Sequence, residues 1–171
     1  MARAKRLARG LLLGCMLLVC VSGCSWFSEA PLEPLDPHLT LTLHASLDTN
    51  RNLYGRPSPV VVRVFQLANS QAFQRATLSQ LSTNPEQVLR ADLLGQEVFL
   101  LRPGQRYRYH FIPEPRTRDI GVIVEYRSID EARWRVVSRV DQSMTPDEFV
   151  SIGRNSVEFT TPSFMEQQSN D

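Results

Sequence analysis

The sequence LTLTLHAS, residues 39–46, alternates strictly between apolar and polar side chains. Leucine and alanine occupy the odd positions, while threonine, histidine and serine occupy the even ones. Successive side chains of a β-strand point to opposite faces of its sheet, so this pattern predicts a half-buried strand. A loop rich in Asp, Asn, Gly and Pro follows over residues 47–58.

The next apolar stretch, PVVVRVFQL at residues 59–67, is hydrophobic on both faces and predicts a central strand covered on each side. Residues 69–92 break this rhythm. Asn69 or Ser70 can cap one short helix, and Asn84 followed by Pro85 marks the start of another. We expect one or two short helices that pack on the sheet through apolar side chains, namely Phe73, Leu78, Leu81, Val88 and Leu89.

Strand patterns return after residue 96. They cover residues 96–101, 106–112, 119–126 and 134–140, with a Pro-Gly turn at residues 102–105. Residues 144–149 are compatible with one helical turn, and residues 150–159 with a final hairpin. Roughly seven or eight short strands separated by turns predict an all-β, two-sheet sandwich with a short helical insertion. We expect this domain to span residues 38–161, followed by a flexible tail over residues 162–171.

The N-terminus has the features of a secretory signal over residues 1–23: four basic residues, then an apolar run, then Ser22-Gly23 before Cys24. This ending resembles the lipobox of bacterial lipoproteins, in which cleavage precedes the cysteine and the cysteine is acylated. The resemblance implies a lipid anchor at Cys24, a Pro-rich tether over residues 24–37, and sorting to the periplasmic face of the outer membrane, because Ser25 is not aspartate. A plain signal peptide with a free thiol is the alternative.

Removal of the signal leaves a chain without lysine, in which aspartate and glutamate outnumber arginine. Clustered positive charge is what phosphate-backbone binding requires, so this composition disfavours nucleic-acid binding. All three cysteines lie at or before position 24, so no disulfide can form within the mature domain.

The lipobox, the alternating first strand, RPSPVVVRVFQL at residues 56–67, ADLL at 91–94 and LLRPG at 100–104 together resemble the TssJ (VasD/SciN-type) lipoproteins of type VI secretion systems. The resemblance implies a transthyretin-like sandwich that binds the periplasmic C-terminal domain of the inner-membrane protein TssM. The contacting element in that family is the loop between the first two strands. By position, the resemblance assigns the partner-binding loop to residues 47–58, with candidate side chains Asp48, Asn50, Arg51, Leu53, Tyr54 and Arg56. Alternatively, Leu53 and Tyr54 fold back as a lid on the end of the sandwich.

No catalytic, cofactor or metal site is expected. His38, His44 and His110 lack ligand spacing, and the adjacent pairs Asp130-Glu131 and Asp147-Glu148 indicate solvated turns. Arginines of two later strands form one basic face if those strands are neighbours (Arg106, Arg108, Arg133, Arg135 and Arg139). The alternative function is a general envelope lipoprotein that binds a glycan or small ligand. A deep pocket lined by aromatic side chains favours that alternative, whereas a smooth sandwich with one projecting loop favours the adaptor.

Overall fold

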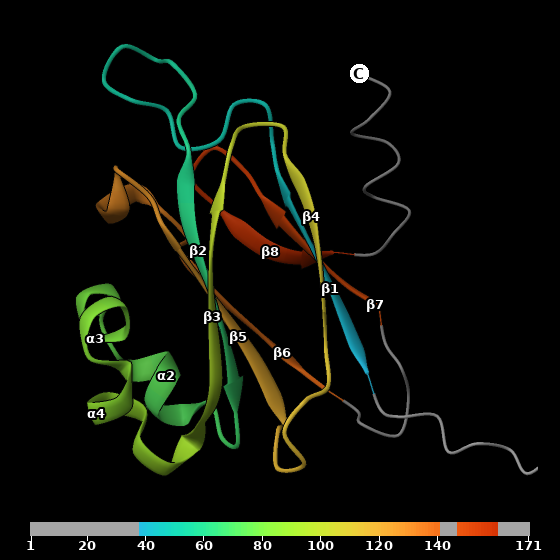
Figure 1. Cartoon of the computed structure of the whole chain (residues 1–171). Coiled ribbons are helices and arrows are strands. Elements are labelled where there is room, and N and C mark those ends of the chain that lie inside the picture. The colour runs from blue at the N-terminus through green and yellow to red at the C-terminus, as the bar shows by residue number, and fades with distance from the viewer. Residues whose placement is uncertain (1–37, 141–146, 161–171) are drawn as a thin grey trace, which may run out of the picture. The chain divides into compact units, whose positions relative to one another are not determined.

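The computed structural model describes residues 38–140 and 147–160, and these form a sandwich of two four-stranded sheets. Figure 1 shows the sheets face to face, with the helices beside the sheet that contains β2. One sheet has the order β4-β1-β7-β8 and the other β3-β2-β5-β6. The strands are β1 (Leu39–Ala45), β2 (Val60–Leu67), β3 (Leu93–Leu101), β4 (Arg106–Phe111), β5 (Asp119–Glu125), β6 (Arg135–Arg139), β7 (Asp147–Ile152) and β8 (Val157–Thr160). The predicted two-sheet sandwich is confirmed.

The signal peptide (1–23), Cys24 with its tether (24–37), and the tail (162–171) lie outside the described residues. Within the described ranges, none of the helices has the length and apolar character that crossing a membrane requires.

Strand β1 is an interior strand, antiparallel to β4 on one side and parallel to β7 on the other. Leu39, Leu41 and Leu43 face the core and are fully buried, as the alternation predicts. The expectation that the opposite face is exposed is wrong for Thr40 and Thr42, which are only 7% and 2% exposed. A strand with neighbours on both sides has its small polar side chains covered by the longer side chains of those neighbours.

Strand β2 lies between β3 and β5, so the prediction of a central strand is confirmed. Its valines Val60, Val62 and Val64 face the other sheet and join the main core. Phe65 and Leu67 belong to a second apolar cluster on the outer face of the same sheet. Strand β2 is therefore apolar on both faces because each face meets a separate core.

The helical insertion covers this second cluster. It contains α2 (Gln71–Arg75), α3 (Leu78–Thr83), α4 (Pro85–Leu89) and the 3₁₀ helix η2 (Arg90–Asp92). The predicted packing residues Phe73, Leu81 and Leu89 are buried. The insertion has more helical turns than expected, because α3 begins at a capping box in which Thr77 and Gln80 satisfy each other's backbone N–H groups. Asn84 precedes α4 with Pro85 at its first turn, but the Asn84 side chain makes no capping hydrogen bond.

The predicted turn at residues 102–105 is confirmed. Gln105 N–H donates to the Arg102 carbonyl at 2.9 Å, and Gly104 has φ +76°.

The expectation that Asp147-Glu148 lies in a turn is wrong, because both residues begin β7 and pair with Thr40 and Leu41 of β1. That pairing partner lies more than a hundred positions earlier, so local sequence does not reveal it. Residues 144–146 of the expected helical turn lie outside the described part of the chain.

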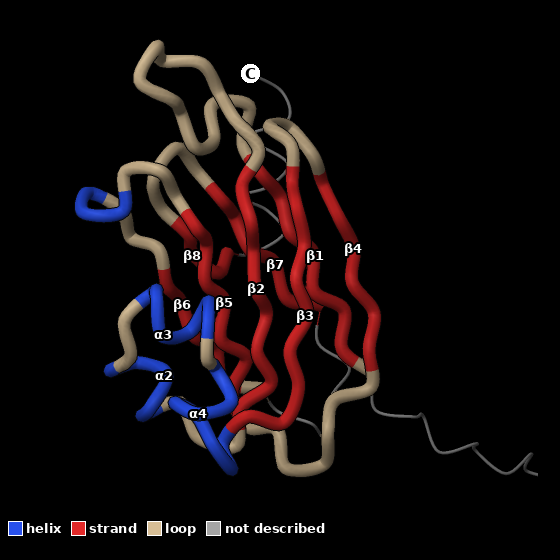
Figure 2. The backbone as a smooth tube through the Cα atoms, turned by 60° about the vertical axis from the view of Figure 1, so that its left-hand side comes forward, coloured by secondary structure: helices blue, strands red, loops and turns tan. Residues whose placement is uncertain are grey.

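Four connections meet at one end of the sandwich, and we call this set the loop end. They are residues 46–59 (β1 to β2), 102–105 (β3 to β4), 126–134 (β5 to β6) and 153–156 (β7 to β8). Backbone hydrogen bonds join them: Gly104 N–H donates to the Ser46 carbonyl, Asn50 N–H to the Arg154 carbonyl, and Arg133 N–H to the Asn155 carbonyl. Figure 2 shows the β1–β2 loop extending beyond the other connections.

Candidate partner-binding loop

The base of the β1–β2 loop is anchored in the sandwich. Thr49 is fully buried, and its Oγ1 donates to the carbonyl of Ile152 in β7 at 2.7 Å. The N–H of Ser58 donates to the Thr49 carbonyl at 3.1 Å, which joins the two sides of the loop. Both ends of the projecting segment are therefore fixed to a rigid scaffold.

The Asn50 side chain joins the two ends of this loop and connects the loop to the β5–β6 connection. Its side-chain Nδ2 donates to the Pro59 carbonyl at 2.7 Å, and its Oδ1 accepts from the Arg127 N–H at 2.9 Å. Asn50 is 4% exposed and has φ +50°, a left-handed conformation that asparagine tolerates better than most residues. The structure thus places this predicted contact residue inside the loop base, where it positions the loop.

Asp48 is held by three polar neighbours. Ser46 Oγ donates to its Oδ1 at 2.8 Å, Arg154 Nε lies 3.1 Å from its Oδ2, and Arg51 Nη2 lies 3.6 Å from the same oxygen. The Ser46 hydrogen bond, followed by that of Arg154, holds the pKa of Asp48 below its usual value, although partial burial opposes the shift. The carboxylate is therefore ionised at neutral pH and ties the β7–β8 turn to the loop.

The tip of the loop is a closed turn over residues 52–56. Asn52 Oδ1 accepts from the N–H groups of Tyr54 and Arg56, at 2.9 and 3.0 Å. Asn52 N–H donates to the Arg56 carbonyl at 2.9 Å, and Gly55 adopts φ +72°, which glycine adopts without steric cost. This network fixes the backbone of the tip through local hydrogen bonds.

Leu53 and Tyr54 project from this fixed turn into solvent. Their exposed fractions are 102% and 88%. The alternative in which they fold back as a lid on the sandwich is therefore wrong. Arg51 and Arg56 flank them and are also exposed. Of the six predicted loop residues, the structure places Arg51, Leu53, Tyr54 and Arg56 on the surface, whereas Asp48 and Asn50 hold the loop in place.

Arg127 is a neighbour of this loop that the sequence did not indicate. It begins the β5–β6 connection, and together with Arg51, Leu53 and Tyr54 it lines an open hollow of about 510 Å³. No local motif marks it, because Asn50, which accepts a hydrogen bond from its N–H, lies 77 positions earlier in the chain.

The other candidates from the sequence are dispersed. His44 lies beside Arg106; burial, and then the charge of Arg106, lower the pKa of its imidazole. His110 accepts from or donates to Thr40 Oγ1 at 3.0 Å. Within the described ranges, no three His, Cys, Asp or Glu residues gather in a way that could hold a metal ion.

The expectation that the arginines of two later strands form one basic face is wrong. Arg106 and Arg108 lie on β4, whereas Arg135 and Arg139 lie on β6, and these strands belong to different sheets. Arg135 instead serves the helical insertion: its Nη1 donates to the carbonyls of Phe73 and Ala76, at 2.8 and 2.9 Å. These carbonyls end α2, so the guanidinium caps that helix.

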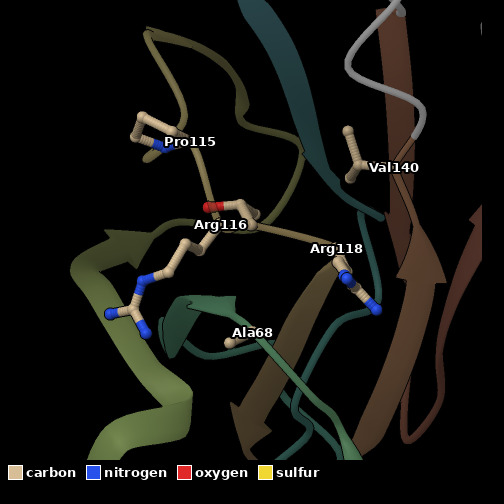
Figure 3. Close-up of a pocket in the computed structure, with 6 residues that line it drawn as sticks. Ala68, Pro115, Arg116, Arg118 and Val140 are labelled. Carbon is tan, nitrogen blue, oxygen red and sulfur yellow. The ribbon is translucent and has the colours of Figure 1, made fainter.

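A second hollow, of about 570 Å³, lies at the opposite end of the sandwich beside the β4–β5 connection. Pro115, Arg116, Arg118, Ala68 and Val140 line it, and Figure 3 shows the two arginine side chains extending in different directions. No aromatic side chain lines this hollow, and its cations do not converge on one point. It lacks the features expected of a glycan or small-ligand pocket.

A protein-family model described as "Type VI secretion lipoprotein, VasD, EvfM, TssJ, VC_A0113" matches residues 37–157 of the chain. The chain belongs to this family of type VI secretion lipoproteins. The match covers strands β1 to β7 and ends at Val157, the first residue of β8. A comparison with curated proteins gave no match.

Solved type VI secretion lipoproteins have the same fold. The T6SS lipoprotein TssJ1 from Pseudomonas aeruginosa is 30% identical with a TM-score of 0.71, over 73% of this chain and 95% of that one. Serratia marcescens Lip, a membrane-bound component of the type VI secretion system, is 23% identical with a TM-score of 0.69, over 74% and 98%. A chain in the structure of the T6SS protein TssM C-terminal domain (869-1107) from EAEC is 23% identical with a TM-score of 0.64, over 72% and 98%.

Proposed function

We propose that this type VI secretion lipoprotein has a non-enzymatic anchoring role. Acylated Cys24 holds it at the periplasmic face of the outer membrane, and its β1–β2 loop binds the periplasmic C-terminal domain of TssM. The observation that carries the proposal is the exposure of Leu53 and Tyr54 on a hydrogen-bonded turn.

The loop is already ordered before it meets a partner. Ordering a flexible loop at an interface costs free energy, and a preorganised loop avoids that cost. The tip is already closed by the bonds of Asn52, and the base is held by Thr49 and Asn50. Tyrosine is enriched among the few interface residues that dominate affinity, and the leucine beside it adds apolar area. The loop therefore presents a small, rigid apolar surface surrounded by polar residues.

The choice of partner rests on the family. This chain matches the family model over residues 37–157, and a chain of the same fold occurs in the EAEC structure of the TssM C-terminal domain. The sequence-level resemblance assigns the contact to the loop at residues 47–58. The exposed tip lies in the middle of that range.

The binding test uses a soluble form of the mature chain, from Ser25 to Asp171 without the acylated Cys24, and the periplasmic domain of TssM from the same genome. We expect the double variant Leu53→Ala/Tyr54→Ala to raise the Kd by roughly 30-fold or more, since loss of a hot spot costs about 2 kcal/mol or more. The matched control is Val98→Ala/Leu100→Ala, which truncates two other exposed apolar side chains, on β3. Unchanged binding by the tip variant would place the interface elsewhere, and no binding by the wild-type chain would reject the adaptor role.

The anchor test uses the full-length protein with Cys24→Ser. One acyl chain binds a membrane only marginally, while two or more hold it stably. We expect the variant to leave the outer-membrane fraction and to keep the same thermal unfolding midpoint, because position 24 precedes the folded domain. Retention of the variant in outer membranes would show that the lipid is not the anchor.

A further inference from the structure

The loop end carries an unequal distribution of charge. Its four connections contain six arginines and three carboxylates: Arg51, Arg56, Arg102, Arg127, Arg133 and Arg154, with Asp48, Asp130 and Glu131. The described residues as a whole contain fifteen arginines and twelve carboxylates. The loop end therefore accounts for the entire net positive charge of the described part of the chain, and the rest of it is balanced.

Part of this charge is neutralised locally and part is not. Asp48 pairs with both Arg51 and Arg154, so one carboxylate serves two guanidinium groups. Arg56 and Arg127 are exposed, and neither side chain has an ion pair or hydrogen bond among the described residues. The backbone N–H of Arg127 holds the loop through Asn50, while its guanidinium remains available to a ligand.

These charges adjoin the exposed apolar tip. The hollow of about 510 Å³ between the β1–β2 loop and the β5–β6 connection is lined by Arg51, Asn52, Leu53, Tyr54, Arg127 and Ser128. It contains two guanidinium groups and no carboxylate. A smaller hollow of about 220 Å³ shares Arg51 and Asn52 as lining residues and also contains Arg154 and a single carboxylate, that of Glu131. A rigid apolar tip thus stands next to a hollow that favours an anion.

Resting on the proposed function, we infer that the protein partner of this loop presents an acidic segment, and that a carboxylate of this segment enters the hollow between Arg51 and Arg127 while an adjacent apolar surface covers Leu53 and Tyr54. Arg127 is then a specificity-determining residue outside the β1–β2 loop. Arginine suits this role because its planar fork pairs with a carboxylate through two hydrogen bonds.

The two halves of the contact predict different kinetics. Charge complementarity mainly raises the association rate and is screened by salt, whereas a buried apolar anchor mainly lowers the dissociation rate. Reversal of Arg56 and Arg127 should therefore lower the association rate and remove its salt dependence. Truncation of Leu53 and Tyr54 should raise the dissociation rate at every salt concentration.

The test measures association and dissociation of the mature chain and the TssM periplasmic domain at 50 and 300 mM NaCl. We expect Arg56→Glu/Arg127→Glu to lower the association rate about tenfold at 50 mM and to leave little difference between the two salts. The matched control is Arg108→Glu/Arg116→Glu, which makes the same change in charge on β4 and at the opposite end. Arg127→Glu alone should give part of the effect, and its unfolding midpoint should equal that of the wild type.

Three outcomes would overturn the inference. If the wild type binds, the tip variant fails and the two charge-reversal variants behave alike, then the proposed function stands and the acidic contact is rejected. If the wild type binds vesicles containing phosphatidylglycerol, and Arg56→Glu/Arg127→Glu abolishes that binding but not TssM binding, the arginines serve the membrane instead. If the wild type does not bind TssM, both proposals fall together.

Discussion

Replacement of Asn50 by alanine should destabilise the loop base more than replacement by glycine. Asn50 combines two features: a side chain that bonds to Pro59 and Arg127, and a backbone at φ +50°. Alanine removes the side-chain bonds and is also strained at positive φ. Glycine removes the same bonds but accepts the backbone conformation.

The expected magnitudes follow from these contacts. Each lost hydrogen bond costs about 0.5–1.5 kcal/mol, and the lower part of that range applies because Pro59 and Arg127 are exposed enough for water to replace a partner. An alanine held in the left-handed region costs about 1–2 kcal/mol more. We therefore expect Asn50→Ala to lower the free energy of unfolding by about 2–4 kcal/mol and Asn50→Gly by about 1–2 kcal/mol. For a domain of this size the alanine variant should melt roughly 5–15 °C lower.

Urea denaturation of the mature chain measures both variants, and hydrogen exchange of the Arg127 amide gives the local readout. That amide donates to Asn50 Oδ1, so its protection should fall in both variants. The control Asn69→Ala removes an asparagine that accepts from the Gln71 N–H at the opposite end. Equal stability of the alanine and glycine variants would refute the strain argument. An unchanged Arg127 amide would refute the assigned hydrogen bond.

Three further predictions concern the core and the helical insertion. Gly121→Ala should destabilise the fold by about 1–3 kcal/mol, because a Cβ there would lie 2.7 Å from the Phe73 ring. In a double-mutant cycle, Phe73→Leu in the same chain should recover part of this loss. Strict additivity of the two substitutions would contradict the contact. Arg135→Ala should cost about 1–3 kcal/mol by leaving the Phe73 and Ala76 carbonyls without their donor, whereas Arg139→Ala on the same strand should cost little. Burial raises the pKa of Glu148, partly offset by the Ser138 hydroxyl, so its ionised form disfavours folding and stability falls as pH rises through that pKa. Glu148→Gln should therefore raise the melting temperature at pH 7.5 but hardly at pH 4, and an equal shift at both pH values would contradict this sign.

Local patterns were reliable where a single face or turn decides the outcome. The sequence correctly predicted the valines of β2, the apolar face of β1 and the turn at Pro103-Gly104, because side-chain period and backbone preference act within a few residues. The additional helix α3 is also predictable from the sequence, since Thr77 and Gln80 have the spacing of a capping box. The projection of the loop could be predicted from its polar composition, but the fate of Leu53 and Tyr54 could not.

The wrong predictions share one cause, which is contact between segments that are far apart in the sequence. The sequence indicates a turn at Asp147-Glu148, but in the structure both residues lie in β7, which pairs in parallel with β1. Arg106 and Arg135 look like parts of one face until the strand order assigns them to different sheets. Asn50 looks like a contact residue until its side chain meets the Pro59 carbonyl and the Arg127 amide.

A β-sandwich with a helical insertion and one polar loop between its first two strands can be predicted from the amino-acid sequence alone. These properties follow from the order of apolar and polar side chains and from the positions of proline and glycine, which act locally. The folded chain is needed to show which loop residues face solvent, which hold the loop, and that Arg127 lies beside the tip. Those facts depend on hydrogen bonds between connections far apart in the chain, whose free energy exists only once both sheets have formed.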